Sequence, residues 1–166
     1  MYNKTKIKKY INDGKKNILM FDRTKGWMTD GYSMISTNFP GICSVLDEMF
    51  YKTEKASFRD KSGTDEEFDY NRMLNICDSD LKPLKITPYL MDSGKLSLRV
   101  FINENGAEIL LQKKYTDIFN EWMDLDYLQS GDCCSPIYVK KEEDIVGLIL
   151  PVRTQEGASF KVVIAD

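Results

Sequence analysis

The 166-residue sequence contains no histidine. Histidine is the commonest general acid or base in enzymes and the commonest side-chain metal ligand. Its absence therefore narrows the enzymatic hypotheses more than any other feature of the composition. Carboxylates remain available, and Asp30 beside Gly31, or the pair Asp78 and Asp80, are the candidates for a metal-dependent site. Because no known metal loop, P-loop or nucleophile elbow occurs, we expect a protein that is not an enzyme, with Asp30 as a turn or strand-end residue.

Long apolar runs are also missing. No stretch approaches the roughly 20 apolar residues that a transmembrane helix needs. The lysine-rich N-terminus is not followed by the apolar segment of a secretory signal. We therefore expect a cytoplasmic protein without a membrane partner. With 42% hydrophobic and 30% charged residues, the chain has the composition of one globular domain, residues 1–166.

The cysteines lack the spacing of a metal site. The four are Cys43, Cys77, Cys133 and Cys134, and no C-x-x-C pair occurs. Adjacent cysteines do not easily chelate one ion with the usual tetrahedral geometry, and no histidine can complete the site. We expect reduced thiols, no metal and no cofactor.

Charge is distributed unevenly along the chain. The first 25 residues contain eight Lys or Arg and two Asp, which gives this segment a net charge of +6. Since the whole chain carries −3, the remainder carries −9. A basic end on an acidic body is typical of a nucleic-acid-facing surface joined to a protein-facing one, and a solvated lysine face is the alternative interpretation.

The first half of the chain shows alternating helical and strand patterns. Residues 3–13 have helical spacing through Ile7, Tyr10 and Ile11, with Gly14 placed to end the helix. The pattern then predicts these further elements: a strand at 17–21 paired with one at 27–36, a helix at 42–51, a surface loop at 52–69 and a short helix at 70–77.

The second half is mainly strands. The pattern predicts strands at 84–91, 95–103 and 108–112, a helix at 113–125, a hairpin at 135–153 and a last strand at 159–165. The second arm of the hairpin, residues 146–153, is apolar enough to be buried on both faces. Together these elements predict an α+β fold, in which antiparallel sheets carry two main helices on one face.

Four short motifs occur in an informative order. They are TDGY at residues 29–32, the helix KKYTDIFNEW at 113–122, a strand led by Ser135-Pro136, and LILPVR at 148–153. This order resembles the DNA sliding clamps, specifically the bacterial DNA polymerase III beta subunit. The resemblance covers residues 4–36 and 84–153, which leaves an insertion at 37–83 and a C-terminal extra strand within 154–166.

The resemblance implies a clamp-like domain, about six copies of which close into a ring around DNA. It implies phosphate contacts on the first helix from Lys4, Lys8 and Lys9, in the basic end that Lys15 and Lys16 extend. It also implies a cleft for partner peptides at the boundary between successive domains. One wall would come from Thr29, Gly31 and Tyr32 of one domain, and the other from Leu150, Pro151, Val152 and Arg153 of the next. The sequence departs from the family pattern in three ways. Ser33 stands where the family has arginine, and the chain has one domain where the family has three. The second main helix, at 113–125, is acidic.

Three functions follow, of which the first is favoured. It is a non-enzymatic binding protein that engages a nucleic-acid-processing machine, as a phage or mobile-element inhibitor of a host nuclease such as a CRISPR effector. Acidic residues that would compete with nucleic acid for a basic channel, or simply be solvated, are Asp65, Glu66, Glu67, Asp117 and Glu121. The second is a DNA-binding or processivity factor, and the third is the carboxylate metalloenzyme. Oligomers are compatible with the first two.

Overall fold

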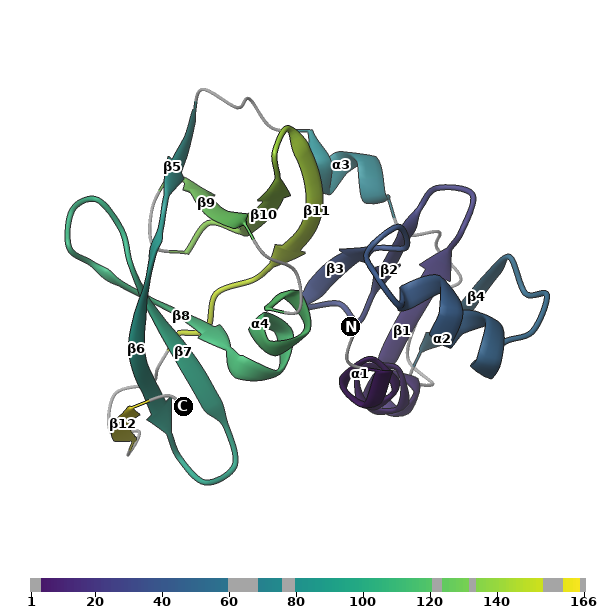
Figure 1. The fold of residues 1–166 in the computed structure, drawn as a ribbon, viewed down its shortest axis with the longest axis horizontal. Coiled ribbons are helices and arrows are strands. Elements are labelled where there is room, and N and C mark those ends of the chain that lie inside the picture. Colours follow the sequence, from purple (N-terminus) through teal and green to yellow (C-terminus); the bar gives the residue numbers. More distant parts are fainter. Residues whose placement is uncertain are drawn as a thin grey trace.

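The protein combines helices with antiparallel sheets (Figure 1). A computed structural model describes residues 4–59, 69–75, 80–120, 124–131, 134–153 and 160–164. These residues form four helices and twelve strands, and every strand pair among them is antiparallel. The predicted α+β class is therefore confirmed.

Eight of the described strands form one sheet, in the order β4-β1-β2-β3-β11-β10-β9-β5. Their bounds are β1 Ile18–Asp22, β2 Trp27–Thr29, β3 Ser33–Ser36, β4 Lys55–Arg59, β5 Leu81–Pro83, β9 Leu125–Ser130, β10 Ile137–Lys141 and β11 Asp144–Ile149. The two halves of the chain meet where β3 pairs with β11, in a register that places Met34 opposite Leu148. Neither half of the chain completes this sheet alone.

Four further strands form a second sheet, in the order β12-β6-β7-β8. They are β6 Lys85–Asp92, β7 Ser97–Ile102, β8 Glu108–Gln112 and β12 Lys161–Ile164. All four were predicted by the strand pattern. The turn between β7 and β8 contains Gly106 at φ +82°, a left-handed conformation that favours glycine and that the Asn105-Gly106 pair predicts.

The helices are α1 (Lys4–Lys16), α2 (Ile42–Met49), α3 (Tyr70–Leu74) and α4 (Lys113–Phe119). α1 packs against both α2 and α4, so the two main helices, predicted at 3–13 and 113–125, lie side by side (Figure 1). Ile7, Tyr10 and Ile11 form the buried stripe of α1. The helix continues to Lys16, so the prediction that Gly14 ends it is wrong. Gly14 instead gives room to Leu19, whose Cβ would lie 3.1 Å from a Cβ at position 14.

The main core joins α1, α2 and α4 to both sheets. Ile11, Leu46, Phe101 and Phe119 are each fully buried in it. Burying a side chain of this size stabilises the fold by about 1.5–3 kcal/mol. The core therefore brings all three helices and both sheets into one hydrophobic unit.

The other face of the β3-β11-β10 region carries a second apolar cluster. Met34, Tyr138 and Leu148 pack there with Tyr70 of α3, and the Tyr138 hydroxyl donates to the Met73 carbonyl at 2.9 Å. Because Ile149 belongs to the main core, β11 is buried on both faces, as its composition predicts.

Three further predicted elements differ from the structure. Within the expected loop at 52–69, residues 55–59 form edge strand β4, which pairs with β1. The strand was not predicted because its segment is mainly polar, although Ala56 and Phe58 are half-buried against the core. The strand expected at 27–36 is interrupted after β2. The helix expected at 70–77 ends at Leu74 in α3, and residues 76–79 lie outside the described part.

The longest misprediction is the helix at 113–125. Its described part ends at Phe119, residues 121–123 lie outside the described part, and β9 begins at Leu125 between β10 and β5. Asp124, at φ +62°, immediately precedes the strand. Pairing with β10 outweighs the local helical period.

No helix within the described segments combines the length and the apolar character of a bilayer-spanning segment.

Candidate functional site

Residues 29–32 form a tightly bonded turn between β2 and β3, here called the TDGY turn. The Thr29 hydroxyl donates to the Ser33 carbonyl at 2.7 Å and accepts from the Gly31 N–H at 3.0 Å. The Asp30 Oδ1 accepts from the N–H groups of Tyr32 and Ser33 at 3.0 and 2.9 Å. Gly31 has φ +89°, a conformation that glycine adopts without strain.

A buried hydrogen-bond network connects this turn to two helices. The Tyr115 hydroxyl of α4 donates to Asp30 Oδ2 at 2.5 Å, and the Ser33 hydroxyl donates to Asp30 Oδ1 at 3.0 Å. Since the Ser33 hydrogen is used for Asp30, the Tyr10 hydroxyl of α1 donates to Ser33 Oγ at 2.9 Å. Asp30 therefore stabilises the turn, which is the function that the sequence favoured over a metal ligand.

Burial extends the pH range over which Tyr10 and Tyr115 stay protonated. Burial raises the pKa of Tyr10 well above its ordinary value, and the negative charge of Asp30 raises it further. The same two causes, in the same order, raise the pKa of Tyr115. Both hydroxyls therefore remain donors to a higher pH than the hydroxyl of an exposed tyrosine does. Sequence reasoning assigned both tyrosines to the core and missed this role, because only tertiary contacts bring them to Asp30.

The rigid turn presents Tyr32 to solvent. The Tyr32 side chain is 58% exposed, although Thr29 and Asp30 beside it are buried. Tyr32 lines a surface hollow of about 320 Å³ together with Asn17, Ile18 and Lys114. A large aromatic side chain at the edge of such a hollow, on a backbone with few alternative conformations, is suited to contact another molecule.

Leu150, the first residue of the segment at residues 150–153, lies directly beside the turn. The Leu150 N–H donates to the Tyr32 carbonyl at 2.9 Å, which continues the β3–β11 pairing beyond Ile149. The two predicted walls of the partner cleft are thus neighbours within one chain. The strand predicted to reach Arg153 ends at Ile149, because Pro151 has no N–H to donate to a ladder.

Two of the four side chains in this segment pack inward. Leu150 packs against the cluster around Leu148, and Val152 against the small sheet, where its N–H donates to the Leu110 carbonyl at 2.8 Å. Pro151 is half-buried and Arg153 is exposed. Leu150 and Val152 are half-buried as well, so Tyr32 and Arg153 are the fully exposed side chains of these two segments.

The predicted phosphate-binding lysines of α1 have protein partners. Lys4 forms an ion pair with Glu48 of α2, and Lys8 Nζ lies 2.5 Å from Glu48 Oε1. Hydrogen bonds from these two lysines hold the pKa of Glu48 below its ordinary value. Lys15 Nζ lies 5.5 Å from the ring centre of Phe50 and 5.6 Å from that of Phe58.

The remaining predicted lysines are exposed. Lys16 lies at the end of α1. Lys9 lines a hollow of about 130 Å³ between α1 and α4, together with Lys6, Lys114 and Asp117. Three lysines from two helices therefore surround one opening, although carboxylates lie among them.

The acidic candidates are only partly described. Asp117 is hydrogen-bonded to Lys113 Nζ at 2.5 Å, one turn away on α4. Asp65, Glu66, Glu67, Glu121 and Asp78 lie outside the described residues. Within the described segments, no three His, Cys, Asp or Glu side chains are grouped to hold a metal ion.

Comparison of the chain with protein families, with curated proteins and with solved structures found no match.

Proposed function

We propose that the chain is a non-enzymatic binding protein on a sliding-clamp-like domain, and that it engages a protein of a nucleic-acid-processing machine. The binding surface consists of Tyr32, Pro151 and Arg153, beside the TDGY turn. Its partner contributes an extended peptide segment to this surface, by analogy with the partner peptides of clamps.

The observation that carries this proposal is the exposed Tyr32 on a turn fixed by Asp30. Tyrosine and arginine are enriched among the residues that contribute most to protein interfaces. A surface that is already ordered loses little conformational entropy on binding.

The narrower form of the proposal is that the partner is a host nuclease, such as a CRISPR effector, and that the chain inhibits it. Its support is the clamp resemblance in a single domain with an overall charge of −3. An acidic protein that binds a nuclease opposes the approach of nucleic acid to the same enzyme.

Affinity capture from cells that contain candidate nucleases and replication proteins tests the proposal. We expect the double variant Tyr32→Ala, Arg153→Ala to lose the captured partner, with the dissociation constant of the purified pair rising at least about tenfold. Tyr51→Ala is the matched control, because Tyr51 is 75% exposed and lies outside the surface. Equal partner binding by the double variant and the control would exclude this surface.

A nuclease assay tests the narrower form. The purified chain, in excess over a guide-loaded CRISPR effector, is expected to reduce cleavage of a duplex target. The double variant is expected to restore cleavage, and the Tyr51→Ala control is not. Full cleavage in the presence of the unmodified chain would exclude inhibition of that effector, and would leave the capture result unaffected.

A second candidate is direct DNA binding, which is favoured by Lys6, Lys9 and Lys114 around the hollow between α1 and α4. It predicts duplex affinity that falls steeply with salt, and a ring of about six chains. Gel-shift titrations at low and moderate salt measure the first property, and light scattering measures the second. Absence of duplex binding at low salt would exclude this candidate.

A further inference from the structure

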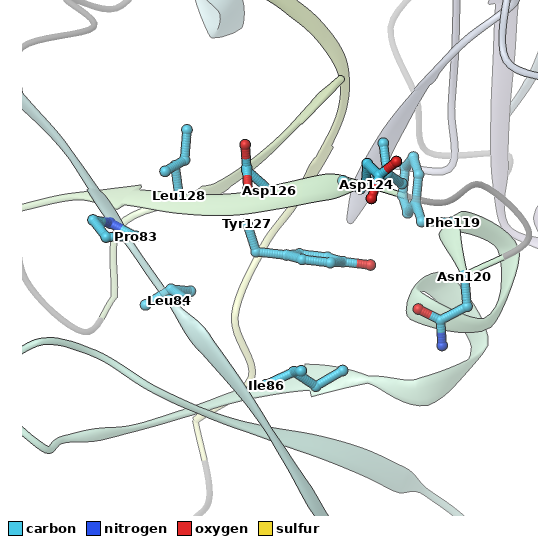
Figure 2. A pocket seen from close by; sticks show the side chains of 10 residues that line it. Pro83, Leu84, Ile86, Phe119, Asn120, Asp124, Asp126, Tyr127 and Leu128 are labelled. Atoms are coloured by element: carbon cyan, nitrogen blue, oxygen red, sulfur yellow. The ribbon is translucent and has the colours of Figure 1, made fainter. Parts of the chain in front are cut away.

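Two hollows of the structure differ in what they offer a ligand. The hollow between β6, β9 and the end of α4 has mainly apolar walls, and the hydroxyl of Tyr127 beside it is buried out of reach (Figure 2). The hollow of about 320 Å³ beside the TDGY turn, here called the Tyr32 hollow, has an aromatic ring, a carboxylate and an ammonium group in its lining. The Tyr32 hollow therefore presents three kinds of recognition group to one ligand.

The Tyr32 hollow lies where α1, β1, the TDGY turn and α4 meet, and all of its lining residues belong to the described part of the chain. Ile18 of β1 lies against the turn, since a Cβ added at Gly31 would be 3.5 Å from Ile18 Cδ1. The volume is at the lower end of the range of small-molecule sites, which is about 300–1,000 Å³. It suits one planar ring system and its substituent.

The aromatic and cationic groups of the hollow suit a nucleotide. Tyr32 is 58% exposed on a backbone that Asp30 holds in place, and exposed aromatic rings stack on nucleobases. Lys114 of α4 is exposed, and it also lines the adjoining hollow between α1 and α4, together with the exposed Lys9. Two ammonium groups are thus available to a phosphate beside a ring that can stack.

The carboxylate of Asp13 determines which base fits. Asp13 is half-buried, and within the described segments no Lys or Arg forms an ion pair with it. Asp30 also lines the hollow, but its two oxygens already accept hydrogen bonds from the turn and from Tyr115. Asp13 is therefore the carboxylate of this hollow that is left to accept from a ligand.

A carboxylate accepts two hydrogen bonds side by side and donates none. On the Watson–Crick edge of guanine, the N1–H and N2–H groups are adjacent donors. Adenine and cytosine place one donor next to an acceptor nitrogen, which a carboxylate repels. The pairing with Asp13 therefore selects guanine.

We propose that the Tyr32 hollow binds a guanine nucleotide. The base stacks on Tyr32 and donates to Asp13, and the phosphate meets the ammonium groups of Lys114 and Lys9. The site shares Tyr32 with the proposed partner surface, but it uses neither Pro151 nor Arg153 and requires no protein partner. Its test on the isolated chain is therefore separate from the test of the proposed function.

Three nucleotides that differ in the base edge test the inference. Guanosine, inosine and adenosine monophosphates are titrated into the full chain, and binding is followed by methyl NMR of Ile18. Inosine monophosphate lacks only the N2 amino group, so we expect it to bind about tenfold more weakly than guanosine monophosphate, and adenosine monophosphate more weakly still. Tyr32→Ala should weaken guanosine monophosphate about tenfold, and Tyr51→Ala, at a tyrosine that is 75% exposed and outside the hollow, should not.

Asp13→Asn separates the carboxylate from the rest of the hollow. The variant keeps the shape of the side chain but replaces one acceptor by a donor, an arrangement that pairs with adenine. We expect it to weaken guanosine monophosphate about tenfold and to abolish the preference over adenosine monophosphate. The inference is overturned if guanosine monophosphate leaves the Ile18 signals unshifted, if the three nucleotides bind alike, or if Asp13→Asn retains the guanine preference.

Two oligonucleotides identify the source of the nucleotide. One is a short single strand of thymidines with one central guanine, and the other has adenine at that position. Both results of interest support the guanine site: tighter binding of the guanine strand than of guanosine monophosphate assigns it to single-stranded nucleic acid, and weaker binding assigns it to the free nucleotide. Equal binding of the two strands, with no binding of the free nucleotide, would overturn the inference.

Discussion

Asp30 organises the TDGY turn through both of its carboxylate oxygens. One oxygen fixes the backbone of residues 32 and 33, and the other accepts from Tyr115 of α4. Hydrogen bonds to a charged acceptor are stronger than those between neutral groups, and their loss leaves several buried donors unsatisfied. One side chain therefore determines how Tyr32 is presented.

Asp30→Ala is expected to lower the free energy of unfolding by about 3–5 kcal/mol, because it leaves the Tyr115 and Ser33 donors without their acceptor. Tyr115→Phe removes one of these bonds and is expected to cost about 1.5–3 kcal/mol. Urea unfolding measures both changes, with exposed Tyr32→Ala as a control that shifts stability by at most about 0.5 kcal/mol. Equal stability of Asp30→Ala and the control would contradict this role of Asp30.

Among the elements, β11 passes α4 at very close range. An added Cβ at Gly147 would lie 2.6 Å from Phe119 Cε1, still closer to Phe119 Cζ, and 3.2 Å from the Met34 carbonyl oxygen. Phe119 is fully buried and cannot move freely. The close packing of β11 on α4 therefore leaves no room for a side chain at Gly147.

Gly147→Ala is expected to destabilise the protein by about 3 kcal/mol through overpacking against Phe119. Phe119→Leu in the same chain provides space and should recover part of the loss, with a coupling of about 1 kcal/mol in a double-mutant cycle. Chemical denaturation of the four proteins measures this coupling. Strictly additive effects would show that the Phe119 ring is not the obstacle.

The charge of α1 depends on its neighbour α2. Glu48 of α2 binds both Lys4 and Lys8, while the adjacent Asp47 binds Arg23 at 2.5 Å. Two of the three predicted phosphate contacts on this helix, Lys4 and Lys8, are thereby engaged within the protein. The exposed lysine face is smaller than the sequence of α1 alone suggests.

Glu48→Gln is expected to raise duplex DNA affinity at low salt, because it releases two ammonium groups. The slope of log affinity against log salt should steepen by up to about 2, since each phosphate contact contributes about 0.9. Glu104→Gln, at an exposed position in the turn between β7 and β8, changes the net charge equally and serves as the control. If the two variants bind duplex DNA alike in gel-shift titrations, net charge and not the position of the lysines is responsible.

At the scale of the whole molecule, the buried tyrosines predict alkaline sensitivity. Tyr10, Tyr115 and Tyr127 each have a pKa that burial raises above the value of about 10 in an unfolded chain. Above that pH the unfolded chain loses these protons while the folded protein retains them, so the unfolded state is favoured. Their contribution to stability is complete below pH 10 and declines as the pH rises further.

We therefore expect the unfolding free energy to fall above about pH 10, by about 1.4 kcal/mol per pH unit for each of the three tyrosines. Urea unfolding at a series of pH values from 8 to 11 measures this slope. Tyr115→Phe should reduce the slope by the share of one tyrosine. A slope that stays the same in this variant would show that Tyr115 titrates normally in the folded protein.

The sequence by itself determined the α+β class, the apolar stripe of α1, the buried β11 and the four strands of the small sheet. These features follow from local periodicity and turn residues, which act within a few positions along the chain. Strand β9 was missed because it lies between β10, the next strand of the chain, and the distant β5, a pairing that the local pattern around Leu125 does not reveal.

Only the tertiary structure decided how the candidate sites are assembled. The pairing of β3 with β11 places Tyr32 beside Leu150. The packing of α1 on α2 brings Lys4 and Lys8 into ion pairs with Glu48. Tyr10, Asp30 and Tyr115 likewise meet across long stretches of chain. The physical reason is that burial and hydrogen-bond partners depend on distance in space, which no local sequence pattern specifies.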